Sequence, residues 1–366
     1  MQAPLIVIVR KATPEFPRHS EPAITERRDG SLFMIWQEYM AGGNGGEDNA
    51  PSRLSSLRSC DGGRTWIDPR ILVQRDPGDV NVYSPNLLVL PGGEWLFIYF
   101  HYRVLASGQP PSTSAYLRRS PDEGATFGAP ECLWDRQPLG FASGVVKRHS
   151  SGRIVLPIGR QTGAIWSPTD HEVLGCMLSD DDGRTWHASS GWIDLPLRGA
   201  MESHVEELRD GRLMMVMRTQ LGAVFFSLSS DAGDTWSKPQ TTGLRSPESC
   251  PELVRIPSTG DLLLTWNDSE YDPAFGSHYG KRSPLSLALS RDDGRSWTRV
   301  GNVETDPVRG FSNPVCHVSR RGQVTLMYWT CRYHVDRWLM DVSLLDLRAA
   351  LFDVEWIYSR CPSDRS

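Results

Sequence analysis

The chain has few of the features that mark nucleic-acid-binding or membrane-spanning proteins. Lysine occurs only four times in 366 residues, and the formal net charge is −5. Such a chain offers no basic surface to nucleic acid. No apolar run approaches the ~20 residues that cross a bilayer, and Met1–Lys11 contains too short an apolar run for a secretory signal. The sequence therefore predicts no membrane or nucleic-acid partner.

Paired cysteines and metal-ligand motifs are also missing. The seven cysteines are odd in number and scattered, without a C-x-x-C pair. This pattern favours reduced thiols in a cytoplasmic protein over a disulfide framework. No H-x-x-H motif and no calcium loop of the EF-hand form occurs, so we expect neither a metal nor another cofactor. The oligomeric state stays open.

What the chain does have is a short motif that recurs five times with the pattern S-x-D-x-G-x-[TS]-[WF]. Its copies span Ser59–Trp66, Ser120–Phe127, Ser179–Trp186, Ser229–Trp236 and Ser290–Trp297. The Ser and Asp side chains can hydrogen-bond turn backbone, and the Gly can adopt a positive φ. The closing aromatic residue offers a large apolar surface to a neighbouring sheet. A turn this specific, repeated five times, indicates a repeated β-unit.

A second repeat, a β-hairpin, occurs six times. Each copy is an apolar strand, a Gly-bearing turn and another apolar strand. The turn glycines are Gly30, Gly93, Gly152, Gly211, Gly260 and Gly322. Every hairpin except the last is followed by one copy of the aspartate motif, which predicts a third and a fourth strand joined by that turn.

Six units of four strands predict an all-β fold, a six-bladed β-propeller with four-stranded antiparallel blades in a single domain over residues 1–366. The sixth unit has no aspartate motif. We expect Leu5–Val9 to complete the blade formed by residues 312–345, because an open ring would leave two sheet edges exposed. Residues 342–352 could hold a last strand followed by a short helix.

The geometry of a propeller locates the candidate site. The start of strand one, the end of strand two and the start of strand three share one face, where loops converge on the central axis and a pocket forms. The polar and aromatic candidates for substrate binding on that face are His101, Arg103, Arg160, His204, Arg218, Asn267, Arg282 and Phe311. The carboxylates expected there include Glu21, Asp48 and Glu202.

Repeated aspartate turns on six blades resemble the exo-α-sialidase (neuraminidase) superfamily, the proteins with BNR repeats. That resemblance implies three arginines that clamp a carboxylate, a tyrosine nucleophile, a glutamate that activates it and an acid/base aspartate. Glu202 matches the glutamate, Arg218 and Arg282 match two arginines, and Asp48 lies in the Gly-rich loop where the aspartate is expected.

Two positions depart from the family pattern. His19-Ser20-Glu21-Pro22 stands where the first arginine would precede Ile-Pro, and Phe311 stands where the tyrosine would open blade six. Phenylalanine cannot attack an anomeric carbon, so we expect standard sialidase activity to be absent or very weak.

The leading functional hypothesis is a sialidase-like glycoside hydrolase that acts on an acidic or highly hydroxylated glycan terminus, with Glu202, Asp48 and Glu21 as catalytic carboxylates. One alternative is a uronate lyase, in which His101, Tyr102 or His204 moves the proton. Another is a glycan-binding propeller without catalysis, with a pocket lined by Phe141, Tyr102 and Phe311. The sugar, the linkage and the stereochemical outcome stay open.

Overall fold

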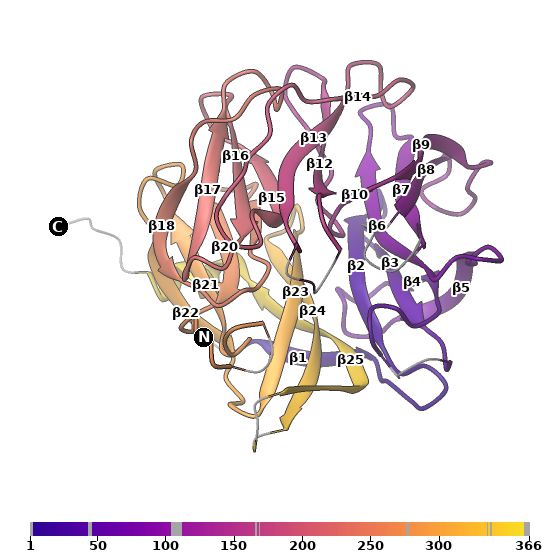
Figure 1. Ribbon diagram of the computed structural model, residues 1–366. Coiled ribbons are helices and arrows are strands. Elements are labelled where there is room, and N and C mark those ends of the chain that lie inside the picture. The colour runs from indigo at the N-terminus through magenta and orange to yellow at the C-terminus, as the bar shows by residue number, and fades with distance from the viewer. Residues whose placement is uncertain are drawn as a thin grey trace.

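Six antiparallel sheets stand around a central axis in the computed structural model (Figure 1). The structure describes residues 3–42, 46–103, 112–164, 167, 169–275, 278–334, 336 and 339–361. Residues 43–45 of the Gly-rich loop lie outside the described residues. The all-β six-bladed propeller is confirmed.

The first three blades are formed in chain order. Blade one holds β2 (His19–Glu26), β3 (Leu32–Tyr39), β4 (Ser52–Ser59) and β5 (Ile67–Val73). Blade two holds β6 (Asn81–Val89), β7 (Trp95–Arg103), β8 (Ser112–Ser120) and β9 (Glu131–Gln137). Blade three holds β10 (Leu139–Gly140), β11 (Lys147–Arg148), β12 (Ile154–Gln161), β13 (Glu172–Ser179) and β14 (His187–Ala188). Its inner strand is split, since β10 and β11 both pair with β12.

The last three blades complete the ring. Blade four holds β15 (Met201–Glu207), β16 (Leu213–Arg218), β17 (Ala223–Ser229) and β18 (Gln240–Arg245). Blade five holds β19 (Glu252–Arg255), β20 (Leu262–Asn267), β21 (Leu285–Ser290) and β22 (Thr298–Glu304). Blade six holds β23 (Arg309–Val318), β24 (Gln323–His334), β25 (Leu339–Asp353) and β1 (Leu5–Arg10).

The N-terminal strand closes the ring as predicted. β1 pairs antiparallel with β25, with Leu5 opposite Leu351 and Ile8 opposite Arg348. Figure 1 shows the indigo β1 beside the yellow β25. The blade is longer than residues 312–345, because β25 continues to Asp353, and the helix α1 (Val354–Ser359) follows it. Among the described residues, no helix has the length and apolarity needed to cross a membrane.

The hydrophobic core lies between adjacent blades. One cluster joins Met214 and Val216 of blade four to Leu253 and Trp266 of blade five. The aromatic residues of the repeated turns seal such clusters from outside, as Trp297 does here. Each turn therefore attaches its own blade to a neighbour.

All five aspartate turns join strand three to strand four and share one set of hydrogen bonds. In the third copy, Gly183 N–H donates to Ser179 Oγ at 2.8 Å. Thr185 donates to Asp181 twice, from its backbone N–H at 2.8 Å and from its hydroxyl at 2.7 Å. These bonds from Thr185, helped by Ser179, lower the pKa of Asp181 to about 2 although the side chain is exposed.

Replacing Asp181 with alanine should lower the melting temperature and leave ligand binding in the axial pocket unchanged, because the turn lies on the periphery. Because the pKa of Asp181 is lower in the folded state, the ionised side chain stabilises the fold at pH values above its unfolded pKa of 3.8. This stabilisation is lost as the pH falls towards about 2. Melting curves of wild type and Asp181→Ala should therefore converge in acid. Asp353→Ala is the control, since this side chain makes no cap hydrogen bond. Unchanged melting together with lost binding would contradict a structural role.

The inner strands of four blades bend at one corresponding step. Glu21, Ser84, Glu202 and Asn313 have φ values of 46°, 50°, 34° and 49°, in the left-handed region that L-residues rarely adopt. The strand register shifts at each of these residues. Such bulges redirect side chains at the rims of sheets. Two of the redirected side chains are the candidate carboxylates Glu21 and Glu202.

Candidate active site

A pocket opens on the predicted face, with a cavity volume of about 220 Å³. Part of its lining is aromatic and includes Tyr83, Phe100, Tyr102 and Phe141. The charged and polar part of the lining, called the charged wall below, consists of Asp48, Gln161, Glu172, Arg198, Glu202, Arg218 and His278. The cavity is thus suited to a ligand that has both apolar and charged or hydroxylated groups.

Glu202 and Arg218 form the centre of the charged wall. Arg218 ends β16 and pairs with Glu202 on the neighbouring strand β15. It also pairs with Glu248 at 2.5 Å. Burial disfavours the carboxylate form of Glu202, but the Arg218 charge, assisted by the Cys250 thiol and Arg282, lowers the pKa of Glu202 to about 2. Glu202 is therefore an ionised carboxylate with about a third of its side chain exposed (33%).

Arg282 lies next to this pair. It is 2% exposed and donates to Ser312 Oγ at 3.0 Å and to the Glu248 carbonyl oxygen at 3.1 Å. Among the described residues, no carboxylate oxygen lies within 4.0 Å of its guanidinium nitrogens. Burial and the nearby Arg218 charge lower the pKa of Arg282. The ionised Glu202 acts in the opposite direction and offsets part of the cost of burying this charge.

Arg18 supplies a third arginine that the sequence prediction missed. It precedes the expected position by two residues, is 4% exposed, and pairs with Glu21 at 2.8 Å and Asp48 at 2.6 Å. Its guanidinium also lies over the rings of Tyr39 and Trp329. The signal was available, because Arg18 directly precedes β2 on the predicted face.

Glu21 and Asp48 differ in environment. Glu21 is buried, accepts hydrogen bonds from Arg18, Ser20 and Asn313, and does not line the pocket. Asp48 lines the pocket, and its side chain is 61% exposed. Glu21 is consequently placed to hold Arg18 rather than to touch a ligand.

Polar contacts connect Glu202 to Glu21 across the axis. The Cys250 thiol donates to Glu202 Oε2 at 2.8 Å and lies 3.7 Å from Asn313 Oδ1. Asn313 Nδ2 donates to Glu21 Oε1 at 3.2 Å. The two predicted carboxylates therefore belong to one hydrogen-bonded network, but only Glu202 lies at the cavity surface.

Glu172 is the second functional candidate that the sequence prediction missed. It opens β13, the third strand of its blade, and lines the pocket with Glu202. Burial, reinforced by the Glu202 charge and opposed by Arg198 and Arg218, raises the pKa of Glu172 to about 8. The rule that strand three begins on the pocket face would have found it.

Four arginine charges act on His278, which also lines the pocket. Burial and the charges of Arg282, Arg218, Arg198 and Arg18 lower the pKa of His278 well below its usual value. The imidazole is therefore neutral at physiological pH, and two of the four cations, Arg198 and Arg218, line the cavity with it. Arg198, from the connection before β15, is held by Asp170 at 2.9 Å and by Glu248.

The chain belongs to the BNR repeat-like domain family. The family's description matches residues 30–326, which include all five repeated turns. The match agrees with the expected superfamily and with the observed blades.

Two characterised relatives are sialidases by name. The chain is 24% identical over 317 residues to a sialidase of Micromonospora viridifaciens, a match covering 77% of this chain and 45% of that protein. It is 30% identical over 132 residues to an anhydrosialidase of Macrobdella decora, covering 35% of this chain and 17% of that protein. The chain thus matches less than half the length of either relative.

Solved structures share the fold. The NanB sialidase of Streptococcus pneumoniae superposes with a TM-score of 0.72 at 13% identity, covering 96% of this chain and 70% of that one. A leech intramolecular trans-sialidase gives 0.72 at 15% identity, covering 99% and 72%. A protein of unknown function from Dyadobacter fermentans gives 0.70 at 17% identity, covering 95% and 97%.

Phe311, which was predicted to bind substrate, does not line the described pocket. Its ring is fully buried in the core between blades five and six, against Tyr328. Successive side chains of a strand face opposite sides. The next residue, Ser312, is the one that contacts Arg282.

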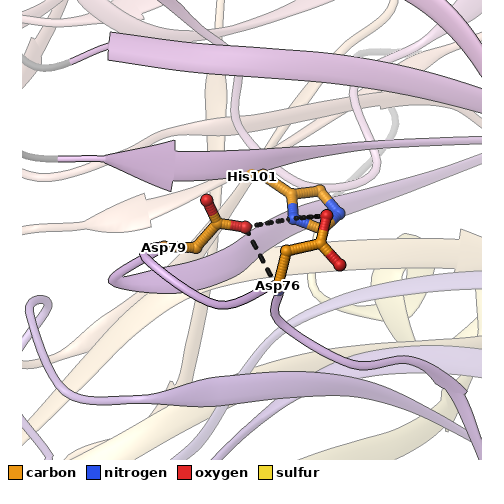
Figure 2. A group of neighbouring side chains, drawn as sticks. All are labelled: Asp76, Asp79 and His101. Carbon is orange, nitrogen blue, oxygen red and sulfur yellow. Dashed lines mark hydrogen bonds and ion pairs between the residues drawn. The ribbon is translucent and has the colours of Figure 1, made fainter.

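His101 and Arg103 are also absent from the pocket. Figure 2 shows His101 beside Asp79 and Asp76, and its Nδ1 lies 2.6 Å from Asp79 Oδ2. Arg103 donates to the other oxygen of Asp79. Because alternate side chains of β7 face opposite sides, these two residues reach Asp79 while Tyr102 reaches the cavity.

The same group is the one cluster among the described residues whose side chains could hold a metal ion. Ligand atoms of Asp76, Asp79 and His101 lie within 4.8 Å of one another (Figure 2). Asp79, however, is already neutralised by Arg103 and accepts the backbone N–H of Asp76 at 3.2 Å. The cluster is explained as an ion-pair network.

Three other predicted binding residues have structural partners. Arg160 is exposed and lies over the Trp192 ring, 4.3 Å from its centroid. His204 is buried in a pair with Glu252. Asn267 donates to the backbone carbonyl of Phe311 at 3.1 Å. None of the three lines the described pocket, although Gly159, Gln161 and Ser203, the neighbours of Arg160 and His204, do.

Proposed function

We propose that the protein is a glycoside hydrolase of sialidase-like fold that binds a sugar bearing a carboxylate. The observation that carries this proposal is the pair of arginines, Arg198 and Arg218, that line the cavity with the ionised Glu202, while the buried Arg282 lies next to them. A carboxylate is the natural ligand, because planar guanidinium groups bind carboxylates through paired, charge-assisted hydrogen bonds. Glu202 provides an ionised carboxylate at the cavity surface, which glycoside hydrolysis requires.

The alternatives are weaker on this geometry. A uronate lyase loses two of its three candidate bases, since His101 and His204 are paired elsewhere and only Tyr102 lines the pocket. A glycan-binding propeller keeps Tyr102 and Phe141 as stacking surfaces but gives no role to the ionised Glu202.

The experiment is a screen of the purified protein against aryl glycosides of uronic and nonulosonic acids and of neutral hexoses. We expect release of the aryl group from an acidic glycoside. Absorbance from a new double bond on uronate oligosaccharides would instead identify a lyase. Raised melting temperature without turnover would identify a binding protein.

Within that screen, the standard aryl sialoside should be hydrolysed very weakly or not at all. The reason is that blade six presents Ser312 to the site and buries Phe311 in the core, so no tyrosine hydroxyl opens that strand. The measurement is the initial rate against that of a characterised sialidase on the same substrate. A comparable rate would show that another side chain serves as the nucleophile.

A further inference from the structure

Glu172 lies in the charged wall of the pocket, against a glycine of the neighbouring strand. Its carboxyl group lies over the backbone of Gly159 on the neighbouring strand, where any Cβ would overlap its Oε1 atom. Gly159 lines the pocket as well. A side chain at position 159 would therefore displace the Glu172 carboxyl group from this place.

The groups that face Glu172 come from three directions. Glu202 stands on β15, Arg218 on β16, and Asp170 and Arg198 on the connections before β13 and β15. Burial and the Glu202 charge raise the pKa of Glu172 to about 8, whereas Arg218 holds that of Glu202 at about 2. Two carboxyl groups in one cavity are thus driven to opposite protonation states at neutral pH. Such a divergence is what acid and base roles require.

We propose that Glu172 is the proton donor to the leaving group, with Glu202 as its ionised partner, in the glycoside hydrolysis on which this inference rests. The Glu172 proton passes to the glycosidic oxygen as the bond from that oxygen to the anomeric carbon breaks. The oxygen keeps the bonding electron pair and leaves as an alcohol. The Glu202 carboxylate stabilises the positive charge on the sugar. Water then adds to the anomeric carbon, and its proton returns to Glu172.

The other predicted carboxylates fit this role less well. Asp48 is largely exposed and already accepts a hydrogen bond from Arg18 at 2.6 Å. Glu21 is enclosed by Arg18, Ser20 and Asn313 away from the cavity surface. Glu172, in contrast, lines the pocket and keeps its proton at neutral pH.

A test of the protonation state needs no substrate. Because the folded pKa of about 8 exceeds the unfolded value of 4.5, the stability that Glu172 contributes is present below pH 4.5 and is lost as pH rises through about 8. The melting temperature of wild type should therefore fall relative to Glu172→Gln across this window. Glu15→Gln, at an exposed position, should track wild type. A constant difference between wild type and Glu172→Gln would overturn the proposal.

Catalysis is tested with two leaving groups on the acidic sugar found in the screen. Glu172→Gln should lose about 10²–10⁴-fold in turnover of an alkyl glycoside, and should keep most of its rate on a dinitrophenyl glycoside, whose leaving group needs no proton. The alkaline limb of the wild-type rate near pH 8 should disappear. Gly159→Ala keeps the carboxyl group but displaces it, so it should show the same leaving-group dependence.

The outcomes separate this inference from the function. Equal losses on both leaving groups, or an unchanged alkaline limb in Glu172→Gln, would overturn the role of Glu172 while hydrolysis stands. If wild type hydrolyses none of the glycosides, the proposed function fails and the proton-donor role fails with it, whatever the melting curves show.

Discussion

Arg218→Met should destabilise the fold strongly, whereas Arg282→Met should leave its stability nearly unchanged. Removing Arg218 takes a cation from Glu202 and from the fully buried Glu248, and breaking a buried ion pair costs about 3–5 kcal/mol. The lower end is expected, because Glu248 keeps Arg198 and Gln220. Removing Arg282 takes away a buried charge that repels Arg218 and breaks no ion pair within 4.0 Å among the described residues, so the change should stay within about 1 kcal/mol or favour folding.

The two variants should also differ in ligand binding. Arg218→Met should weaken an acidic sugar about 10- to 100-fold, because Arg218 lines the cavity and a hydrogen bond to a charged group contributes about 1.5–3 kcal/mol. Arg282→Met should weaken it less, because this side chain does not line the described cavity. Urea denaturation measures stability, and the shift in melting temperature with added glucuronate or sialic acid measures binding. Arg245→Met is the control, since its side chain is 56% exposed and surface pairs contribute about 0–1 kcal/mol. Equal destabilisation by both substitutions would mean that Arg282 is a structural residue.

Phe311→Ala should cost about 3–5 kcal/mol, the usual cost of removing a buried aromatic ring. The ring is fully buried and meets Tyr328 edge-on, with ring centroids 5.9 Å apart. Phe311→Tyr is the more informative change. Its hydroxyl would be buried in an apolar cluster without a partner, at about 1–3 kcal/mol, and should create no sialidase activity.

Urea denaturation and an aryl-sialoside assay measure these effects. Val308→Ala, at a surface position with 37% exposure, is the control for loss of an apolar side chain. A Phe311→Tyr protein that folds as stably as wild type and releases sialic acid would show that this position can turn towards the pocket.

The repeats allowed the architecture to be predicted because each copy carries its own physical signal. The aspartate turns mark where strand three ends, and the hairpin glycines mark where strand one ends. The run at Leu5–Val9 had no partner nearby in sequence, and the closure of the ring provided one in β25. Local chemistry was sufficient for these features.

The site could be predicted only in part, for two reasons. The direction of a side chain depends on its position in the alternation of its strand, and a long side chain can contact residues several positions away. His101 and Tyr102 are adjacent, yet one contacts Asp79 and the other lines the cavity. Arg18 precedes the family position but its long side chain reaches Asp48. Glu172 required knowing that β13 begins at that residue. A shift of one residue reverses which face a side chain occupies, and sequence patterns define strand ends less sharply than that.

The residues that shape the site and the residues that hold the fold stand at different positions in each repeat. The left-handed backbone step occurs at Glu21, Ser84, Glu202 and Asn313. The same local backbone carries a carboxylate, a hydroxyl or an amide, while the aspartate turns that hold the ring lie elsewhere in each repeat. Exchange of single residues at this step can therefore change the polar groups of the site, directly at Glu202 and through its hydrogen-bonded network at Asn313 and Glu21, without redesigning a blade. A small combinatorial library at these four codons, with glycine included as the residue that this backbone tolerates best, would sample new specificities on an unchanged ring.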